Sequence, residues 1–228
     1  MKNVFHTIKL GVIVVAVIMV SIFGYNLFLK YLNENEVLKQ VIARLEADSR
    51  VAEILVTGVN FDEKTKKTYT TIKFLEYDID GQPLDPKYFS FSGNIIQFQS
   101  LVIRFDDIHV RGGDKLRGKS AYIFWKVFLL DGKNTQEYEI TKVNEVPRGY
   151  KIRGLMNPFE QKLWQNFWQY ALDPQQAHQQ GIKNAQIEAP GSMFIPGILY
   201  TIRIEHDGGL RIGSNPLSPI LKGENIPR

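Results

Sequence analysis

The chain opens with a long run of hydrophobic positions that no charge interrupts. Residues 10–29 read LGVIVVAVIMVSIFGYNLFL, with Lys9 before the run and Lys30 after it. About 20 apolar residues in a helix span the hydrocarbon core of a bilayer. Residues 1–30 are therefore predicted to form a short N-terminal tail and a transmembrane helix, which contacts the lipid bilayer through Leu10–Leu29.

The apolar run predicts a permanent anchor rather than a cleaved signal. A cleaved signal has an apolar core of roughly 7–15 residues followed by small residues, and this run is longer and has no such site. Lys2 and Lys9 precede the run, whereas Lys30, Lys39 and Arg44 follow it, so the positive charges are nearly balanced. The short N-terminal tail favours a cytoplasmic N-terminus, with the C-terminal domain outside the cytoplasm.

Residues 31–49 are predicted to continue as an amphipathic connecting helix. Leu38, Val41, Ile42 and Leu45 recur at helical spacing. This short apolar stripe fits a brief coiled coil or packing against the chain's own domain, and the pattern does not separate the two.

From Arg50 onward the pattern alternates with a period of two, which is typical of strands. The fold class predicted is α+β: an N-terminal transmembrane helix followed by a mainly antiparallel β domain, residues 50–213, with one covering amphipathic helix. The predicted strands are Val51–Asn60, Lys67–Asp80, Tyr88–Gly93, Ile95–Phe105, Ala121–Leu130, Gln136–Val143, Tyr150–Arg153, Ile198–Glu205 and Leu210–Ile212.

Two of these strands carry further information. In the second, Ile72 and Phe74 share one face whereas Leu75 and Tyr77 share the other, which predicts a β-bulge or cover on both faces. Ala121–Leu130 is the most apolar run after the anchor, and its length fits a central strand buried on both faces.

The covering helix is predicted at residues 157–172. Asn157 is a suitable N-cap and Pro158 occupies the first helical position. Trp164 and Trp168 widen its apolar stripe. These aromatic residues fit packing against the sheet, which is the default, or contact with a partner or a membrane surface.

Two polar segments complete the chain. Residues 174–192 are predicted to be irregular or briefly helical. The tail, residues 214–228, contains Pro216, Pro219 and Pro227, so it is predicted to be extended rather than part of a central strand.

Charge and cysteine content exclude several classes of protein. The net charge is +4, but three of the 28 basic residues and none of the 24 acidic residues lie in residues 1–30. The remaining 25 basic and 24 acidic residues give a net charge of +1, which argues against nucleic acid as a partner. The absence of cysteine excludes disulfides, thiolate metal sites and cysteine nucleophiles.

One polar cluster is a candidate for chemistry. Asp106, Asp107, His109, Arg111 and Asp114 follow a predicted strand closely. Carboxylate oxygens with one imidazole can hold a divalent ion, but the spacing matches no known metal-binding loop. Adjacent acids and arginines at a strand end are more often solvated ion pairs, so no metal is predicted here.

No other motif predicts a catalytic, cofactor or metal site. Glu205, His206 and Asp207 precede two glycines and fit a hairpin turn. The sequence contains no nucleophile elbow, dinucleotide-binding loop, phosphate-binding loop or zinc-protease motif. The sequence therefore predicts no cofactor and favours a non-enzymatic protein, without deciding the matter.

Two functions remain open at this point. The first is a single-pass membrane-anchored protein whose exported β-rich domain is a non-enzymatic binding or scaffold module in an envelope assembly, with a protein partner or a second copy of itself. The alternative is a membrane-tethered hydrolase, or a ligand- or glycan-binding domain, that acts on an envelope polymer through Asp106 and Asp107.

Overall fold

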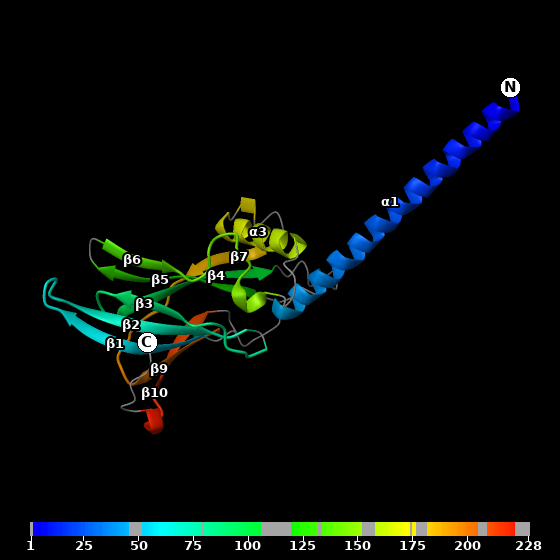
Figure 1. The fold of residues 1–228 in the computed structure, drawn as a ribbon. Coiled ribbons are helices and arrows are strands. Elements are labelled where there is room, and N and C mark those ends of the chain that lie inside the picture. The colour runs from blue at the N-terminus through cyan, green and yellow to red at the C-terminus, as the bar shows by residue number, and fades with distance from the viewer. Residues whose placement is uncertain are drawn as a thin grey trace. The chain divides into compact units, whose positions relative to one another are not determined.

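The computed structural model describes most of the chain. The described residues are 2–45, 52–78, 80–105, 120–131, 134–151, 158–173, 175–176, 182–204 and 209–221. An N-terminal apolar helix is followed by two antiparallel sheets and one further long helix, which confirms the α+β class (Figure 1). The chain divides into two compact units, residues 1–40 and 41–228, and each is described by itself.

The first unit is a single straight run of helix. Helix α1 spans Lys2–Leu45, so both the apolar helix and its helical continuation were predicted correctly as far as Leu45. Its segment Ile13–Val37 is long and apolar enough to cross a membrane. Large hydrophobic side chains from Ile13 to Leu32 are exposed on all sides of the helix. Lys30 and Glu34, one turn apart, form an ion pair at 3.8 Å.

The first sheet of the second unit contains five antiparallel strands. Their order is β10 (Leu210–Pro216), β9 (Ile198–Ile204), β1 (Ala52–Asp62), β2 (Lys67–Glu76) and β3 (Lys87–Phe91). The expected irregularity lies in β1, where the register shifts between Val56 and Gly58, and not in β2. Strand β10 continues to Pro216, beyond the predicted end of the last hairpin at Ile212. The next residue, Leu217, donates its N–H to the Gly197 oxygen at 2.8 Å.

The second sheet is built around β4 and β5. Its order is β6 (Asn134–Glu139), β5 (Ser120–Asp131), β4 (Ile95–Phe105) and β7 (Ile182–Glu188), and β8 (Gly191–Met193) pairs with the other end of β4. Residues 174–192 were predicted to be irregular or briefly helical, and residues 175–176 are helical. From residue 182 the prediction was wrong, because β7 and β8 are strands of this sheet. Residues 174 and 177–181 lie outside the described residues. The predicted strand at Tyr150 was also wrong, since Arg148–Tyr150 is a 3₁₀ turn, η1. A second short turn, η2, covers Pro219–Leu221.

The two sheets pack face to face as a sandwich (Figure 1). Phe74 of the first sheet stacks on Phe98 of the second, with ring centroids 5.6 Å apart, and meets Phe124 edge-on at 5.5 Å. Aromatic and β-branched residues fill this space because alternate positions of each strand point inward. The core residues are Ala52, Ile54, Val56, Ile72, Phe74, Phe89, Phe91, Ile96, Phe98, Phe124, Val127, Leu129, Ile140, Phe194, Tyr200 and Ile202.

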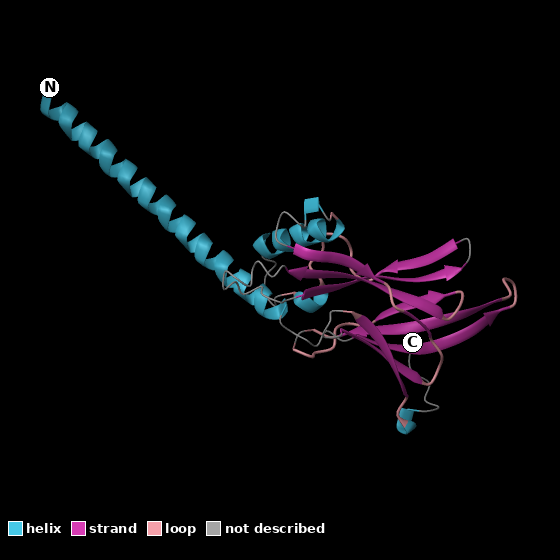
Figure 2. Ribbon diagram, turned by 180° about the vertical axis from the view of Figure 1, so that it is seen from behind, coloured by secondary structure: helices cyan, strands magenta, loops and turns pink. Residues whose placement is uncertain are grey.

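Helix α3 (Pro158–Leu172) lies on the side of the second sheet that faces away from the first (Figure 2). Trp168 meets Trp125 of β5 edge-on at 6.2 Å, and Trp164 lies 4.9 Å from the ring of Tyr150. The Tyr150 hydroxyl accepts the Tyr122 N–H at 3.1 Å. The second sheet is thus covered on both faces near α3, which explains why β5 is apolar on both sides.

Candidate functional site

The polar cluster singled out from the sequence lies outside the described residues. This applies to all five members, Asp106, Asp107, His109, Arg111 and Asp114, and also to residues 205–207. Among the residues that the structure does describe, no three His, Asp or Glu side chains are grouped so that they could hold a metal ion.

Trp164 and Trp168 lie inside the domain and present no contact surface. Their side chains are 1% and 0% exposed, so the packing alternative describes this helix. The Trp168 indole N–H donates to the Glu145 oxygen at 2.8 Å, whereas the Trp164 indole N–H has no partner among the described residues. Both rings serve to fix α3 on the sheet, and we do not retain them as contact residues.

Side chains join β3 to β6 along one edge of the sandwich, although these strands share no backbone ladder. We call this set of contacts the β3–β6 seam. The Ser92 N–H donates to the Gln136 amide oxygen, and the Tyr138 hydroxyl donates to the Ser90 oxygen, each at 2.8 Å. The members of the seam are Asp85, Lys87, Ser90, Ser92, Gln136, Tyr138, Ile140 and Arg148.

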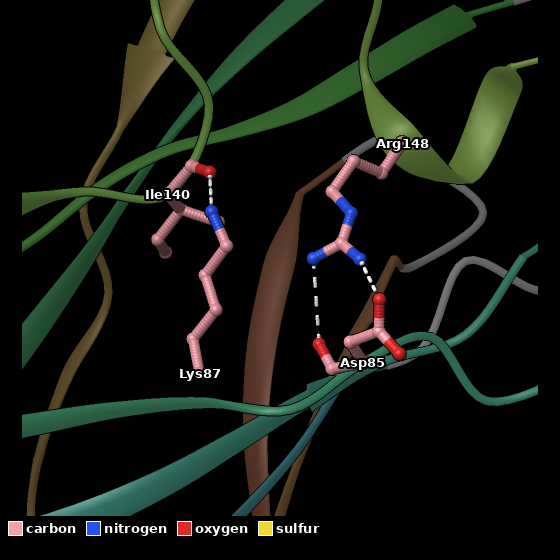
Figure 3. Close-up of polar contacts among 4 residues, drawn as sticks. All are labelled: Asp85, Lys87, Ile140 and Arg148. Carbon is pink, nitrogen blue, oxygen red and sulfur yellow. Dashed lines mark hydrogen bonds and ion pairs between the residues drawn. The ribbon is translucent and has the colours of Figure 1, made fainter.

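Charged groups complete the seam (Figure 3). The Lys87 ammonium donates to the main-chain oxygen of Ile140, and the Arg148 guanidinium meets the Asp85 carboxylate at 2.6 Å. Burial lowers the pKa of Lys87, and the nearby charge of Arg148 lowers it further. Each of these cations has a partner within the chain, and these contacts help to hold the two sheets together.

The outer face of the first sheet carries a hollow at the opposite edge, which we call the β9–β10 hollow. Its volume is ≈ 480 Å³. Two strands that are neighbours in the sheet supply its described lining. The lining residues are Thr201, Arg203, Arg211, Ile212, Gly213, Ser214 and Asn215.

The register of the β9–β10 hairpin decides which side chains meet in this hollow. Arg203 pairs with Arg211, and Thr201 pairs with Gly213 two residues further along. Residues directly opposite one another in an antiparallel pair lie on the same face. Because Tyr200 and Ile202 of β9 belong to the core, the two arginines and the glycine lie on the outer face.

The paired arginines make one end of the hollow basic. Both side chains are exposed, and like charges directly opposite one another on a sheet are unfavourable to stability. A carboxylate between them accepts charge-assisted hydrogen bonds from both guanidinium groups. Arg211 already interacts with another group of the chain. Among the described lining residues, the two arginines are the charged ones.

Gly213 lies in the middle of the hollow, at a position where the fold does not require a glycine. Its φ lies outside the left-handed region, so the backbone does not need a glycine. A Cβ added there would meet only the Thr201 oxygen, at 3.8 Å, which is ordinary contact. A glycine inside a strand often marks close approach by a ligand or another backbone.

Sequence reasoning missed this site, although part of the signal was present. The alternation in Ile198–Glu205 correctly placed Arg203 outward. Extending the same alternation through Leu210 and Ile212 places Arg211 outward as well. Their direct opposition depends on the register of the hairpin, which the sequence alone does not fix.

A second hollow, of ≈ 510 Å³, lies beside α3. Amide side chains dominate it, with the exposed Leu172 and Val143 among them. Its lining residues are Val143, Asn144, Gln165, Asn166, Trp168, Gln169, Leu172 and Asp173. Only one charged residue lines this hollow, so it offers less chemical selectivity than the arginine-bearing one.

No protein-family model, curated protein or solved structure matches this chain.

Proposed function

We propose that this chain is a single-pass membrane protein whose β-sandwich domain lies outside the cytoplasm and binds a protein partner there. In this account it is a non-enzymatic binding module of an envelope assembly. The lipid bilayer surrounds α1, and the β9–β10 hollow is the contact surface of the domain.

The observation that carries the proposal is the surface of α1. Hydrophobic side chains cover this helix all round between Ile13 and Leu32, and no charge occurs between Leu10 and Leu29. A helix that is apolar on every side is stable in an apolar environment rather than in water. A bilayer satisfies that requirement.

Tethering gives a binding module its physical advantage. Confinement near a membrane raises the effective concentration of the domain around membrane-bound partners, so a modest intrinsic affinity is sufficient. The open edge at β10 and the arginine pair beside it supply a surface with defined chemistry. The seam at the opposite edge keeps the two sheets together while that surface is used.

Site-specific crosslinking in native membranes tests the proposal. A photoreactive amino acid at Asn215, which lines the hollow, is expected to give a discrete adduct of higher mass. The control position is Gln161, which is exposed on α3 and lies outside both hollows. Absence of any adduct from Asn215, or equal adducts from both positions, would contradict the proposal.

The hydrolase alternative has its own test. Replacing Asp106 and Asp107 together with Asn is expected to leave both folding and the Asn215 adduct unchanged. If the double variant folds normally but abolishes the cellular function, these carboxylates are catalytic and the binding-module account is wrong.

A further inference from the structure

We infer that the hollow beside α3 binds a neutral glycan through four side-chain amides. These belong to Asn144, Gln165, Asn166 and Gln169. The inference goes beyond the proposed function, because it assigns the domain a second ligand at a site that shares no described lining residue with the β9–β10 hollow. Three observations carry it: two walls that the fold joins together, a set of unbonded amides, and a lining that is almost without charge.

The first observation is that the fold itself shapes this hollow. Its described lining comes from α3 and from the turn that follows β6, in which the Glu145 N–H donates to the Lys142 oxygen at 3.1 Å. The Trp168 indole N–H donates to the Glu145 oxygen at 2.8 Å and so ties the turn to the helix. The volume of ≈ 510 Å³ lies within the range of about 300–1,000 Å³ that is usual for small-ligand sites.

The second observation is the set of amides. Gln165 and Gln169 are four residues apart on α3, and Asn166 and Gln169 are three apart, so their side chains are neighbours on the helix surface. Asn144 lines the same hollow from the turn. No side-chain hydrogen bond joins any of the four to another described residue. Each amide has one acceptor oxygen and two N–H donors, which are therefore available to a ligand.

The third observation is the near absence of charge. Asp173 is the one charged residue of the described lining, and its Oδ1 accepts the N–H groups of Gln175 and Gln176 at 3.0 and 3.2 Å. A bound anion would find no cation in that lining, and a bound cation would find only this carboxylate. A hydroxyl group is neutral and both donates and accepts, so it matches an amide in both respects.

Other neutral ligands fit the lining less well than a glycan does. A nucleobase stacks on an aromatic ring, whereas Trp168, the one aromatic residue of the described lining, is buried. An extended peptide pairs with a sheet edge, and none of the described lining residues belongs to a strand. The side chains of Val143 and Leu172 are exposed beside the amides and offer apolar contact to the C–H face of a sugar ring.

Binding to a panel of defined compounds tests the inference on the full-length protein in lipid nanodiscs. The panel contains neutral oligosaccharides, matched oligosaccharides that carry carboxylate or sulfate groups, and alanine–glycine peptides of similar mass. Saturation-transfer NMR, with empty nanodiscs as the blank, is expected to show binding of neutral oligosaccharides that does not change between roughly 0.05 and 0.5 M salt. Preference for the charged oligosaccharides or for the peptides, or no binding of any neutral oligosaccharide, would overturn the inference.

A matched pair of glutamine variants locates the binding. Gln169 and Gln161 are both exposed on α3, but only Gln169 lines the hollow. Gln169→Ala is expected to weaken the bound oligosaccharide at least about ten-fold, because the amide's hydrogen bonds are lost. Gln161→Ala is expected to bind within about two-fold of the wild type. Both variants should unfold at the wild-type temperature or above, since alanine favours a helix. Equal affinities of the two variants would overturn the inference.

A second pair of variants tests the other wall. Asn144 and Lys66 both have a left-handed backbone, with φ of 69° and 55°, and only Asn144 lines the hollow. Glycine fits this conformation without strain, so Asn144→Gly and Lys66→Gly should both fold with little loss of stability. We expect Asn144→Gly to weaken the oligosaccharide by about five-fold or more, because it removes one amide, and Lys66→Gly to leave binding unchanged. Unchanged binding by Asn144→Gly, or an equal loss in both variants, would contradict a glycan held between the turn and α3.

Discussion

Tyr138 donates its hydroxyl hydrogen to the main-chain oxygen of Ser90, 2.8 Å away, and so connects two sheets that share no ladder at that edge. The same ring packs against Phe89 and Phe91, with centroid distances of 5.4 and 5.2 Å. One side chain therefore contributes both a polar and an apolar contact to the β3–β6 seam.

Removing that hydroxyl should lower stability measurably. Tyr138→Phe keeps the ring but loses the hydrogen bond, and we expect the free energy of unfolding to fall by about 1 kcal/mol. Urea denaturation followed by tryptophan fluorescence measures the change. Tyr88→Phe is the matched control, because Tyr88 is similarly exposed, at 43% against 40%, and lies on β3, the other strand of the seam. If both variants lose the same amount, the seam does not act as described.

The two buried tryptophans of α3 should respond differently to the same substitution. Trp168→Phe removes a donor and leaves the Glu145 oxygen without that partner. Trp164→Phe removes an indole N–H that has no partner in the part of the chain that the structure describes. Both lose similar ring volume, so we expect Trp168→Phe to be more destabilising by about 1–2 kcal/mol. Thermal and urea unfolding of the two variants test this, and the reverse order would contradict the assigned bonds.

Tyr77 should make stability depend on alkaline pH. Burial, followed by the hydrogen bond to Glu53 at 2.7 Å and its charge, raises the pKa of Tyr77 to about 12. The unfolded chain releases this proton from about pH 10, so between about pH 10 and 12 the folded state binds more protons. Stability from this group is therefore complete below pH 10 and is lost as the pH rises through that window.

The variant Tyr77→Phe isolates that effect. Its unfolding midpoint in urea is expected to fall less than that of the wild type between pH 10 and pH 12. Absorbance of the phenolate should show one late-titrating tyrosine that is missing from the variant. Identical pH profiles for the two proteins would contradict the raised pKa.

Gly213→Ala should stabilise the protein. A glycine within a strand is less stable than alanine by roughly 0.5–1 kcal/mol where the conformation allows both. The φ of Gly213 and the 3.8 Å clearance to the Thr201 oxygen allow both. Thermal unfolding measures the gain, and a clear loss of stability would show that the glycine has a structural role instead.

Local patterns predicted most of the elements because burial imposes a simple periodicity. Hydrophobic residues recur with a regular period wherever they meet an apolar environment. This pattern marks the apolar helix, the β1–β2 hairpin and the covering helix. The run at Ala121–Leu130 was correctly expected in a sheet interior, since β4 and β6 flank it. In each case the neighbours of a residue along the chain carry the information.

The features that were missed depend on partners distant in sequence. Strand β7 is polar because it is an edge strand, and its pairing of Leu101 with Ile187 cannot be read from either segment alone. The hydrophobic pattern suggested an irregularity in β2. The structure has it in the partner strand, where an extra residue near Thr57 of β1 shifts the register of the β1–β2 pair. The opposition of Arg203 and Arg211 follows from the hairpin register and not from either residue's own surroundings.

Extraction of native membranes at alkaline pH is the measurement that tests the central claim most directly. We expect the full-length chain to stay in the membrane fraction, and protease added from outside the cell to digest its sandwich domain. A variant with Met19→Lys and Val20→Lys should be released, because each charge at the centre of a spanning helix costs about 2.5–3.5 kcal/mol. Recovery of the unmodified chain in the soluble fraction, or complete protection of the domain from external protease, would contradict a membrane-spanning helix with an exported domain.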